Sequence, residues 1–223
     1  MSTESESDRL ADIEHRLRLA ESEALPDEDR VRRLKAAYHI GRFMEVLGLD
    51  VDGEHLTRTP ERVANSRIDE IFRGVKEDPR RHLRRTFTPP DHEGDAGFVI
   101  VDGITIKSMC AHHFLPFRGE CHIGYIPQEK LVGLSKLARV ADGYARRPQV
   151  QENLTNEIAD AIHEELNPLA TIVLIEAEHE CMSIRGVEEP RSTTRTSALR
   201  GKAREADHIK NEFFEIVSNG GRR

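Results

Sequence analysis

The order of the patterned segments along this chain predicts an α+β fold. Two helical patterns come first, extended segments follow, and then come a pair of helical patterns, a further extended segment and a last helix. This order differs from the regular strand and helix alternation of doubly wound folds. The sequence also contains neither GxGxxG nor GxxxxGK[ST], so it predicts neither a dinucleotide-binding site nor a P-loop.

The N-terminal part of the chain divides into an extension and a helical region. Residues 1–26 are rich in Glu, Asp, Arg and Ser and carry only a thin apolar stripe, so we interpret them as a flexible or loosely helical extension. The helical region covers residues 27–75. Its first helix follows from apolar side chains that recur at helical spacing over residues 31–47, until Gly48 ends the run.

A second helix is predicted where Thr59 and Pro60 read as an N-cap followed by proline in the first turn. Its apolar pattern continues to Gly74. Residues 76–94 are charged and interrupted by prolines, and we interpret them as a connection.

The rest of the chain supplies the extended segments. Asp102-Gly103 lies between two apolar runs and predicts a bend or a hairpin there. In chain order, the expected elements are strand segments in 98–106, a strand over 119–126, helices from Ser135 to Pro148 and over 150–162, a strand over 171–175, a Ser/Thr-rich loop over 192–197, and a last helix containing Phe213, Phe214 and Val217.

Composition narrows the class of protein. A chain of 223 residues can bury a sizeable core, and a net charge of −7 with scattered basic residues argues against a nucleic-acid surface. No apolar run approaches the roughly 20 residues that span a bilayer, and the N-terminus lacks the pattern of a signal peptide. Together with only three cysteines, this predicts a cytoplasmic protein without membrane contact.

Two clusters of thiols and imidazoles suggest a metal site. Cys110 and His113 have the C-x-x-H spacing, in which a turn can direct a sulfur and a ring nitrogen at one ion. Far downstream, His179 and Cys181 are two residues apart, and on a strand such a pair projects from one face. We expect Cys110, His113 and Cys181 as ligands, with His112 and His179 outside the first shell. Three protein ligands with an open position are typical of catalytic zinc.

The alternative is that these residues are structural. A lone cysteine is usually a small buried hydrophobe, and a lone histidine is usually a satisfied core or surface residue. That alternative describes Cys121, which lies on a predicted strand without a histidine at ligand spacing, with His122 merely as its neighbour. For the two joint clusters the metal interpretation is favoured.

Several segments, taken together and in order, resemble the GTP cyclohydrolase I family from about Val31 to the final helix. The segments are Cys110-x-His112-His113-Phe114, Tyr125-Ile126-Pro127, Gly133-Leu134-Ser135-Lys136-Leu137, Arg147-Pro148-Gln149-Val150-Gln151-Glu152, His179-x-Cys181 and Thr196-Ser197-Ala198-Leu199-Arg200-Gly201. The resemblance implies a tunnelling fold, in which a twisted antiparallel sheet backed by helices joins its copies into a barrel. It also implies a homodecamer, and makes residues 76–223 the catalytic domain.

The resemblance further implies that GTP is hydrolysed to dihydroneopterin triphosphate and formate, in folate and pterin synthesis. Matched motif by motif, it assigns Zn²⁺ to Cys110, His113 and Cys181, and proton transfer to His112 and His179. It assigns guanine recognition to Glu152, with Gln151 alongside. It places near the triphosphate Ser135, Lys136, Arg139 and Arg185. Without the motif, Lys136 and Arg139 would be read as a solvated helix face.

The chain departs from the family pattern at three places. Ala111 stands where the family has Glu, Glu120 where Lys is usual, and Ser66-Arg67 where Met-Tyr is common. Ala111 matters most, because a carboxylate beside the ligands can order water and substrate and alanine cannot. Two alternatives therefore stay open: a diverged purine-nucleotide hydrolase that stops at a ring-opened product, and a non-catalytic assembly protein stabilised by zinc.

Overall fold

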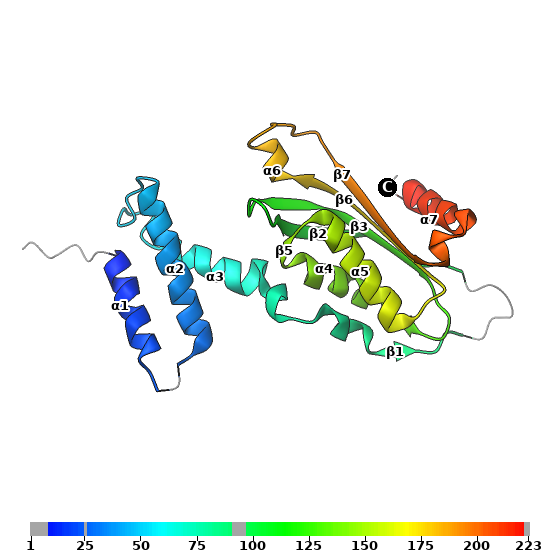
Figure 1. Ribbon diagram of the computed structural model, residues 1–223, viewed down its shortest axis with the longest axis horizontal. Coiled ribbons are helices and arrows are strands. Elements are labelled where there is room, and N and C mark those ends of the chain that lie inside the picture. The colour runs from blue at the N-terminus through cyan, green and yellow to red at the C-terminus, as the bar shows by residue number, and fades with distance from the viewer. Residues whose placement is uncertain (1–8, 25, 91–96, 221–223) are drawn as a thin grey trace, which may run out of the picture. The chain divides into compact units, whose positions relative to one another are not determined.

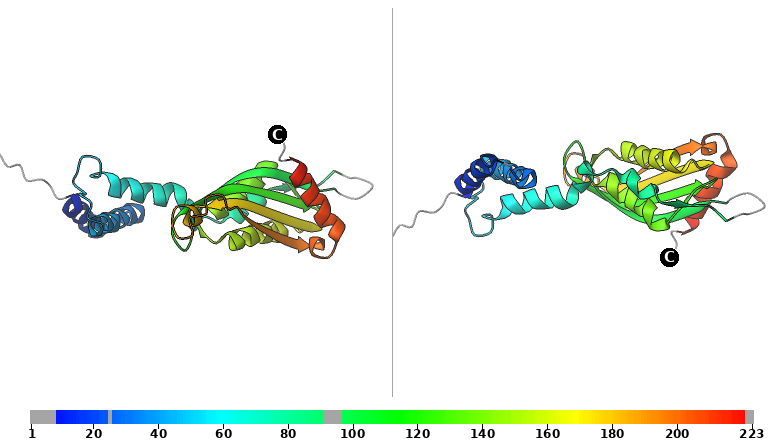
Figure 2. Two further views of the ribbon diagram at one scale, coloured as in Figure 1. Left: turned by 90° about the horizontal axis from the view of Figure 1, so that it is seen from above. Right: turned by 90° about the horizontal axis from the view of Figure 1, so that it is seen from below.

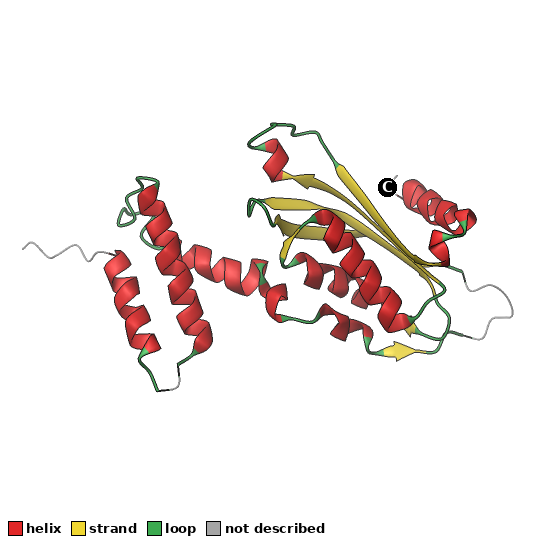
Figure 3. Cartoon of the chain, in the orientation of Figure 1, coloured by secondary structure: helices red, strands yellow, loops and turns green. Residues whose placement is uncertain are grey.

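The computed structural model describes residues 9–24, 26–90 and 97–220 (Figure 1). Those parts of the predicted extension, connection and catalytic domain that fall on residues 1–8, 25, 91–96 and 221–223 lie outside the described residues. The structure confirms the α+β class, since helices accompany a mainly antiparallel sheet (Figure 3). The chain divides into two compact units, Met1–Phe72 and Arg73–Arg223, which we describe separately.

The N-terminal unit is a small helical assembly around its own core. Its elements are α1 (Arg9–Glu21), α2 (Glu28–Val46), α3 (Thr59–Asn65) and the π-helical η1 (Ser66–Ile71). Asp27 caps α2, because its side chain accepts hydrogen bonds from the backbone N–H groups of Asp29 and Arg30. Gly48 ends this helix as predicted, with a φ of 77° that favours glycine. The buried core residues are Leu10, Ile13, Ala37, Met44, Val51 and Ala64.

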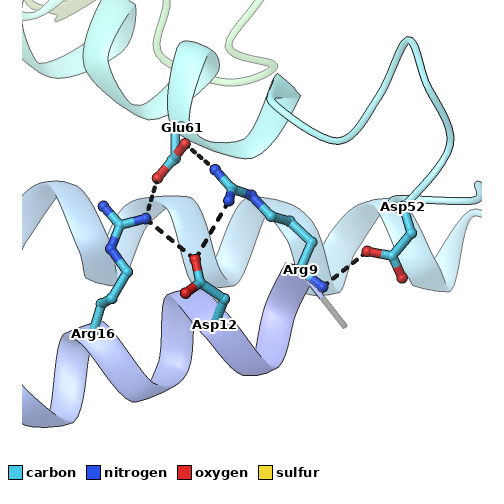
Figure 4. Close-up of polar contacts among 5 residues, drawn as sticks. All are labelled: Arg9, Asp12, Arg16, Asp52 and Glu61. Atoms are coloured by element: carbon cyan, nitrogen blue, oxygen red, sulfur yellow. Dashed lines mark hydrogen bonds and ion pairs between the residues drawn. The ribbon is translucent and has the colours of Figure 1, made fainter. Parts of the chain in front are cut away.

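Ion pairs connect α1 to the rest of this unit (Figure 4). The Glu61 carboxylate of α3 accepts from Arg16 at 2.7 Å and from Arg9, and both guanidinium groups also contact Asp12. The backbone N–H of Arg9 donates to Asp52 at 2.8 Å. The helix α1 lies within the segment that the sequence predicted as an extension. These polar contacts and its own buried apolar side chains together hold it against α3.

The predicted start of the second helix is wrong by one residue. Thr59 is already the first helical residue, because the N–H of Arg62 donates to the carbonyl of Arg58, which therefore occupies the N-cap position and has no side-chain bond there. Pro60 lies in the first turn as predicted. The regular α-helix also ends earlier, at Asn65, where the chain continues as a π-helix.

The larger unit is built on a five-stranded sheet in the order β5-β2-β3-β6-β7. All neighbours are antiparallel except β5 and β2, which are parallel. The strands are β2 (Val99–Cys110), β3 (Pro116–Ile126), β5 (Pro148–Gln149), β6 (Ala170–His179) and β7 (Thr194–Gly201). A separate short pair joins β1 (Thr86–Phe87) to β4 (Leu131–Val132).

Helices cover both faces of this twisted sheet (Figure 2). One face carries α4 (Leu134–Ala145) and α5 (Gln151–Leu166), whose apolar side chains pack on Cys121, Ile123 and Tyr125 of β3. The other face carries α7 (Asp207–Gly220). Phe213 of α7 lies so close to Gly124 that a Cβ there would be 2.7 Å from the ring. The bare glycine thus permits the approach of this helix.

Two sequence predictions about the sheet hold only in part. Asp102-Gly103 does not form a hairpin, because both flanking segments pair with the same strand β3, and the register shift between Val101 and Ile104 marks a bulge with Gly103 at a φ of 70°. The predicted loop 192–197 is partly a strand, since its residues from Thr194 onward belong to β7 and pair with β6.

Short helical segments fill several connections. The predicted connection 76–94 contains the end of η2 (Arg73–Lys76), the 3₁₀ turn η3 (Pro79–Leu83) and strand β1. Two further short segments are α6 (Glu180–Ser183) and η4 (Lys202–Arg204). Within the described residues, none of the helices combines the length and the apolar character that a bilayer crossing requires.

Candidate metal centre and active site

The first cluster lies in the turn between β2 and β3. Cys110 is the last residue of β2, and its N–H donates to the carbonyl of Leu115 at 2.8 Å. The N–H of Phe114 donates to the Cys110 carbonyl at 2.9 Å, and Phe114 has a φ of 54°. This tight turn holds the Cys110 sulfur 3.9 Å from Nδ1 of His112 and 3.9 Å from Nδ1 of His113.

The second cluster lies where β6 ends. His179 is the last residue of that strand, and Cys181 follows in the helical turn α6. The expectation that both project from one strand is therefore wrong, because the chain turns directly after His179. The turn nevertheless directs Cys181 at the first cluster, so that ligand atoms of Cys110, His113 and Cys181 all lie within 4.8 Å of one another.

The donor set fits a borderline-soft divalent cation. Two sulfurs and one imidazole nitrogen are ligands typical of zinc, and their mutual distances allow one ion to reach all three. Burial raises the pKa of the Cys181 thiol, and the neighbouring Cys110 sulfur raises it further. A bound cation reverses this preference, because it stabilises the thiolate form that binds it.

His112 and Arg185 lie at the exposed side of the cluster. The His112 ring is exposed and approaches that of His113 edge-on, with centroids 6.2 Å apart. Arg185 Nη1 lies 2.9 Å from Nε2 of His113. The guanidinium group therefore stands directly beside the cluster, where it can bind an anionic group of a substrate.

His179 is held more firmly than His112. Its ring stacks on Phe117 of β3 at a centroid distance of 4.6 Å and an interplanar angle of 12°. Its Nε2 lies 2.7 Å from Oε1 of Gln151, the first residue of α5. Burial lowers the pKa of His179, and the nearby charge of Glu152 opposes that shift. Glu152 is exposed in the first turn of α5, close to this imidazole.

One group of predicted substrate residues is not brought to the cluster within the chain. Ser135, Lys136 and Arg139 belong to α4, which begins just after β4, where the backbone N–H of Val132 contacts the Tyr125 hydroxyl. Tyr125 pairs with the first residue of β2, whereas Cys110 is the last of its 12 residues. The helix then runs back along the sheet, because β5, which follows it, pairs with Met109 and Cys110; at 1.5 Å per residue the three side chains start about 9–15 Å before the end of α4.

The positive charges of Lys136 and Arg139 on α4 lie near the short helix η3. Burial lowers the pKa of His82 in η3, and the positive charges of Arg81, Arg139 and Lys136 lower it further. Lys136 and Arg139 thus lie beside η3. Ser135 is exposed at the start of the same helix.

Sequence reasoning missed two residues near these elements. Phe117 stacks on His179 because the two are paired in the register of β3 and β6, which no local pattern reveals. His122, read as a mere neighbour of Cys121, is buried and contacts Asp102 through Nδ1. Its Nε2 has no hydrogen-bond partner among the described residues and lies 3.8 Å from a carboxylate oxygen of Glu176.

The structure also places the residues that depart from the family pattern. Ala111 is half-buried in the turn, and its N–H donates to the Gln149 carbonyl at 2.9 Å. Glu120 is exposed and stands opposite Glu176 in the sheet register. Ser66 and Arg67 belong to the π-helix η1 of the smaller unit.

The fold and the site define a class of protein: an α+β chain with a Cys-His-Cys cluster beside two further imidazoles at one end of a twisted sheet. Comparison with known proteins makes this class specific. The profile of the GTP cyclohydrolase I family matches residues 36–218. The chain belongs to the GTP cyclohydrolase I family.

Proteins named GTP cyclohydrolase 1 are similar in sequence to this chain over most of their length. The chain is 50% identical over 172 residues to the GTP cyclohydrolase 1 of Carboxydothermus hydrogenoformans, covering 77% of this chain and 87% of that protein. It is 46% identical over 193 residues to the GTP cyclohydrolase 1 of Corynebacterium glutamicum, covering 86% and 93%. The solved structure of apo archaeosine synthase QueF-Like matches at 15% identity with a TM-score of 0.38, covering 49% of this chain and 97% of that one, which is too weak a likeness to support an argument.

Proposed function

We propose that this chain is a zinc-dependent GTP cyclohydrolase I that converts GTP into 7,8-dihydroneopterin triphosphate and formate. The observation that carries the proposal is the meeting of Cys110, His113 and Cys181 within 4.8 Å, in a chain of this family. A scaffold protein stabilised by zinc has no need of the additional imidazoles of His112 and His179 beside such a cluster. The three reduced cysteines also suit a cytoplasmic enzyme.

The roles of the residues follow from their chemistry. Zinc, when bound by Cys110, His113 and Cys181, supplies a hydroxide near neutral pH. The imidazole carbon of guanine lies between two nitrogens, and each C–N bond that breaks leaves its electron pair on nitrogen. A proton must therefore be delivered to that nitrogen, which the imidazoles of His112 and His179 can do.

The remaining residues bind the substrate. The Glu152 carboxylate can accept from the ring N–H and the exocyclic amine of guanine, beside the proton donor His179. Arg185 stands next to His113 and is suited to a phosphate oxygen. Ser135, Lys136 and Arg139 complete the triphosphate site in this proposal, although they lie elsewhere in the same chain.

The direct test is to incubate the purified protein with GTP and to follow pterin fluorescence and formate release. Equimolar formation of both products is expected. Absence of pterin and formate, in protein that contains one zinc per chain, would overturn the proposed reaction.

The separation of α4 from the cluster supports a homo-oligomer, with the homodecamer of the family as its expected form. Ser135, Lys136 and Arg139 lie about 9–15 Å along α4 from the helix end that leads to β5 and Cys110, on a helix that also packs beside η3. We therefore infer that Ser135, Lys136 and Arg139 act on a substrate held at the Cys-His-Cys cluster of another copy.

Mixed oligomers check this inference. Lys136→Ala and His179→Ala are each expected to lose most activity. When the two inactive variants are unfolded together and refolded as mixed oligomers, activity should return, because some boundaries then combine an intact Lys136 with an intact His179. Light scattering reports the assembly. No recovery in mixed oligomers, or a monomer that turns over GTP, would contradict a shared site.

The turn residue Ala111 is expected to affect the late steps of the reaction. A missing carboxylate leaves the metal ligands intact but removes a group that can orient the ring-opened intermediate, and a misplacement of about 1 Å can cost about 100-fold. We expect the pterin to form more slowly than the ring-opened species, with partial rescue in Ala111→Glu. A chromatographic time course compares the two chains, and equal pterin rates without an accumulating intermediate would show that Ala111 is neutral.

A further inference from the structure

The side chain of Gln151 is buried and saturated with contacts. It is 2% exposed at the start of α5. Its Nε2 lies 3.1 Å from the Ile175 carbonyl oxygen, 3.0 Å from the Thr194 carbonyl oxygen and 3.1 Å from the Thr196 hydroxyl. Its Oε1 lies 2.7 Å from Nε2 of His179. Three acceptors already share the two hydrogens of the amide nitrogen, so no donor remains for a ligand.

These partners decide which way the amide faces. Carbonyl oxygens of Ile175 and Thr194 can only accept, so the nitrogen of Gln151 must point at them. The oxygen then points at His179. Two threonines reinforce this arrangement, because the Thr155 hydroxyl donates to the Gln151 backbone carbonyl at 2.8 Å and lies 2.6 Å from the Thr196 hydroxyl.

The orientation of the amide determines the tautomer of His179. An amide oxygen can only accept, so Nε2 of His179 must carry a hydrogen. In the neutral imidazole the other nitrogen, Nδ1, then has the free lone pair. The stack on Phe117 fixes the plane of the same ring. One tautomer and one ring orientation are therefore selected by two contacts from β3 and α5.

We propose that Gln151 is a positioning residue of the reaction: it holds His179 so that Nδ1, and not Nε2, exchanges the proton with the substrate. This inference rests on the proposed role of His179. Nδ1 takes up the proton that the attacking water loses, and when a C–N bond of guanine breaks it passes this proton to the nitrogen that keeps the electron pair, so that the imidazolium returns to the neutral ring with its proton on Nε2. The family resemblance placed Gln151 beside guanine, and the saturated carboxamide argues for this different role.

The kinetic test separates positioning from substrate binding. Methionine is close to glutamine in length but lacks its hydrogen-bonding groups. In Gln151→Met we expect kcat for GTP to fall about 100-fold with KM unchanged, because a ring misplaced by about 1 Å loses that much. In Gln151→Glu a carboxylate oxygen can still accept from Nε2–H, so kcat should recover in part. A rise in KM with kcat retained would instead assign Gln151 to guanine and overturn the proposal.

Gln149→Met is a matched control. Gln149 is the other buried glutamine of this region, and its Nε2 donates to the Tyr144 carbonyl and to Glu157 rather than toward His179. Its replacement removes the same groups from the same protein interior. We expect it to lower thermal stability to a similar degree as Gln151→Met while kcat stays near that of the unchanged chain. An equal loss of kcat in both variants would attribute the effect to general destabilisation.

A double-mutant cycle identifies the residue through which Gln151 acts. In a His179→Ala background, Gln151→Met should cause no further fall in the rate of GTP consumption. A further 100-fold fall would show that Gln151 acts independently of His179. Full activity of His179→Ala alone would instead refute the role of His179 in the proposed function. If Gln151→Met does not fold, Gln151→Asn, which keeps the amide but is one methylene shorter, enters the same cycle with the same expected outcomes.

Discussion

Replacing Cys181 by serine is expected to release the metal and to slow GTP hydrolysis by about 1,000-fold. A hydroxyl is a poorer ligand than a thiolate for zinc, and only two of the three clustered ligands remain. A metal ion contributes several kcal/mol to the stabilisation of transition-state charge, and each 1.4 kcal/mol or so is a factor of ten in rate. Elemental analysis of protein purified without chelator measures the first effect, and the initial rate of formate release measures the second.

Cys121→Ser provides the matched control. Cys121 is fully buried in the core against α4 and α5, where burial raises the pKa of its thiol, and it lies outside the cluster. Serine there places a hydroxyl among apolar side chains and should cost about 1–3 kcal/mol of stability. The variant should still bind one zinc per chain. Unchanged metal content in Cys181→Ser, or equal metal loss in both variants, would contradict the proposed ligand set.

Glu152→Gln is expected to abolish the preference for guanine. A carboxylate can accept from two donors of guanine, whereas an amide offers one acceptor and directs its own N–H groups at the base. Sites built on such pairing reject a substrate that leaves them unpaired by about 10⁴-fold or more. We therefore expect the unchanged chain to turn over ATP at least about 10⁴-fold less efficiently than GTP, and the variant to lose most of its kcat/KM for GTP.

Glu164→Gln tests whether charge alone explains such a loss. Glu164 lies on the same helix α5, but near its other end, where it pairs with Arg80 of η3. The substitution removes the same charge and should leave kcat/KM for GTP unchanged. Comparable turnover of GTP and ATP by the unchanged chain, or an unimpaired Glu152→Gln variant, would show that another group reads the base.

Local patterns were sufficient to predict the Cys-His-Cys cluster but insufficient for the contacts around it. Cys110 and His113 lie in one turn, and His179 and Cys181 are near neighbours, so their spacing alone predicted two groups of ligands. The Gln151 contact to His179 depends on how α5 approaches β6, and the Phe117 stack depends on strand register. Both are properties of the tertiary structure, because the partners are 28 and 62 residues apart in sequence.

Asp102-Gly103 shows a second limit of sequence reasoning. A turn and a bulge both require a glycine with positive φ, so the dipeptide looks alike in either setting. Only the pairing of both flanks with β3 selects the bulge. In the same way, the family motif names Ser135 and Lys136 as substrate residues but does not reveal that they lie at the start of α4, toward the end of β2 opposite Cys110.

The bulge also sets the phase of β2, and through it the chemistry at the end of that strand. Before the bulge, the odd-numbered Val99 and Val101 face the helices α4 and α5, whereas after it the even-numbered Ile104 and Cys110 do so. The bulge absorbs one extra residue, so the helix-facing side passes from odd-numbered to even-numbered residues. If β2 instead paired regularly through Gly103 without the bulge, every later residue would slip by one, Met109 would take the helix-facing side in place of Cys110, and the thiol would turn away from Cys181. Residue 110 supplies the sulfur, and the bulge at Gly103, seven residues earlier, decides on which side of the sheet that sulfur lies.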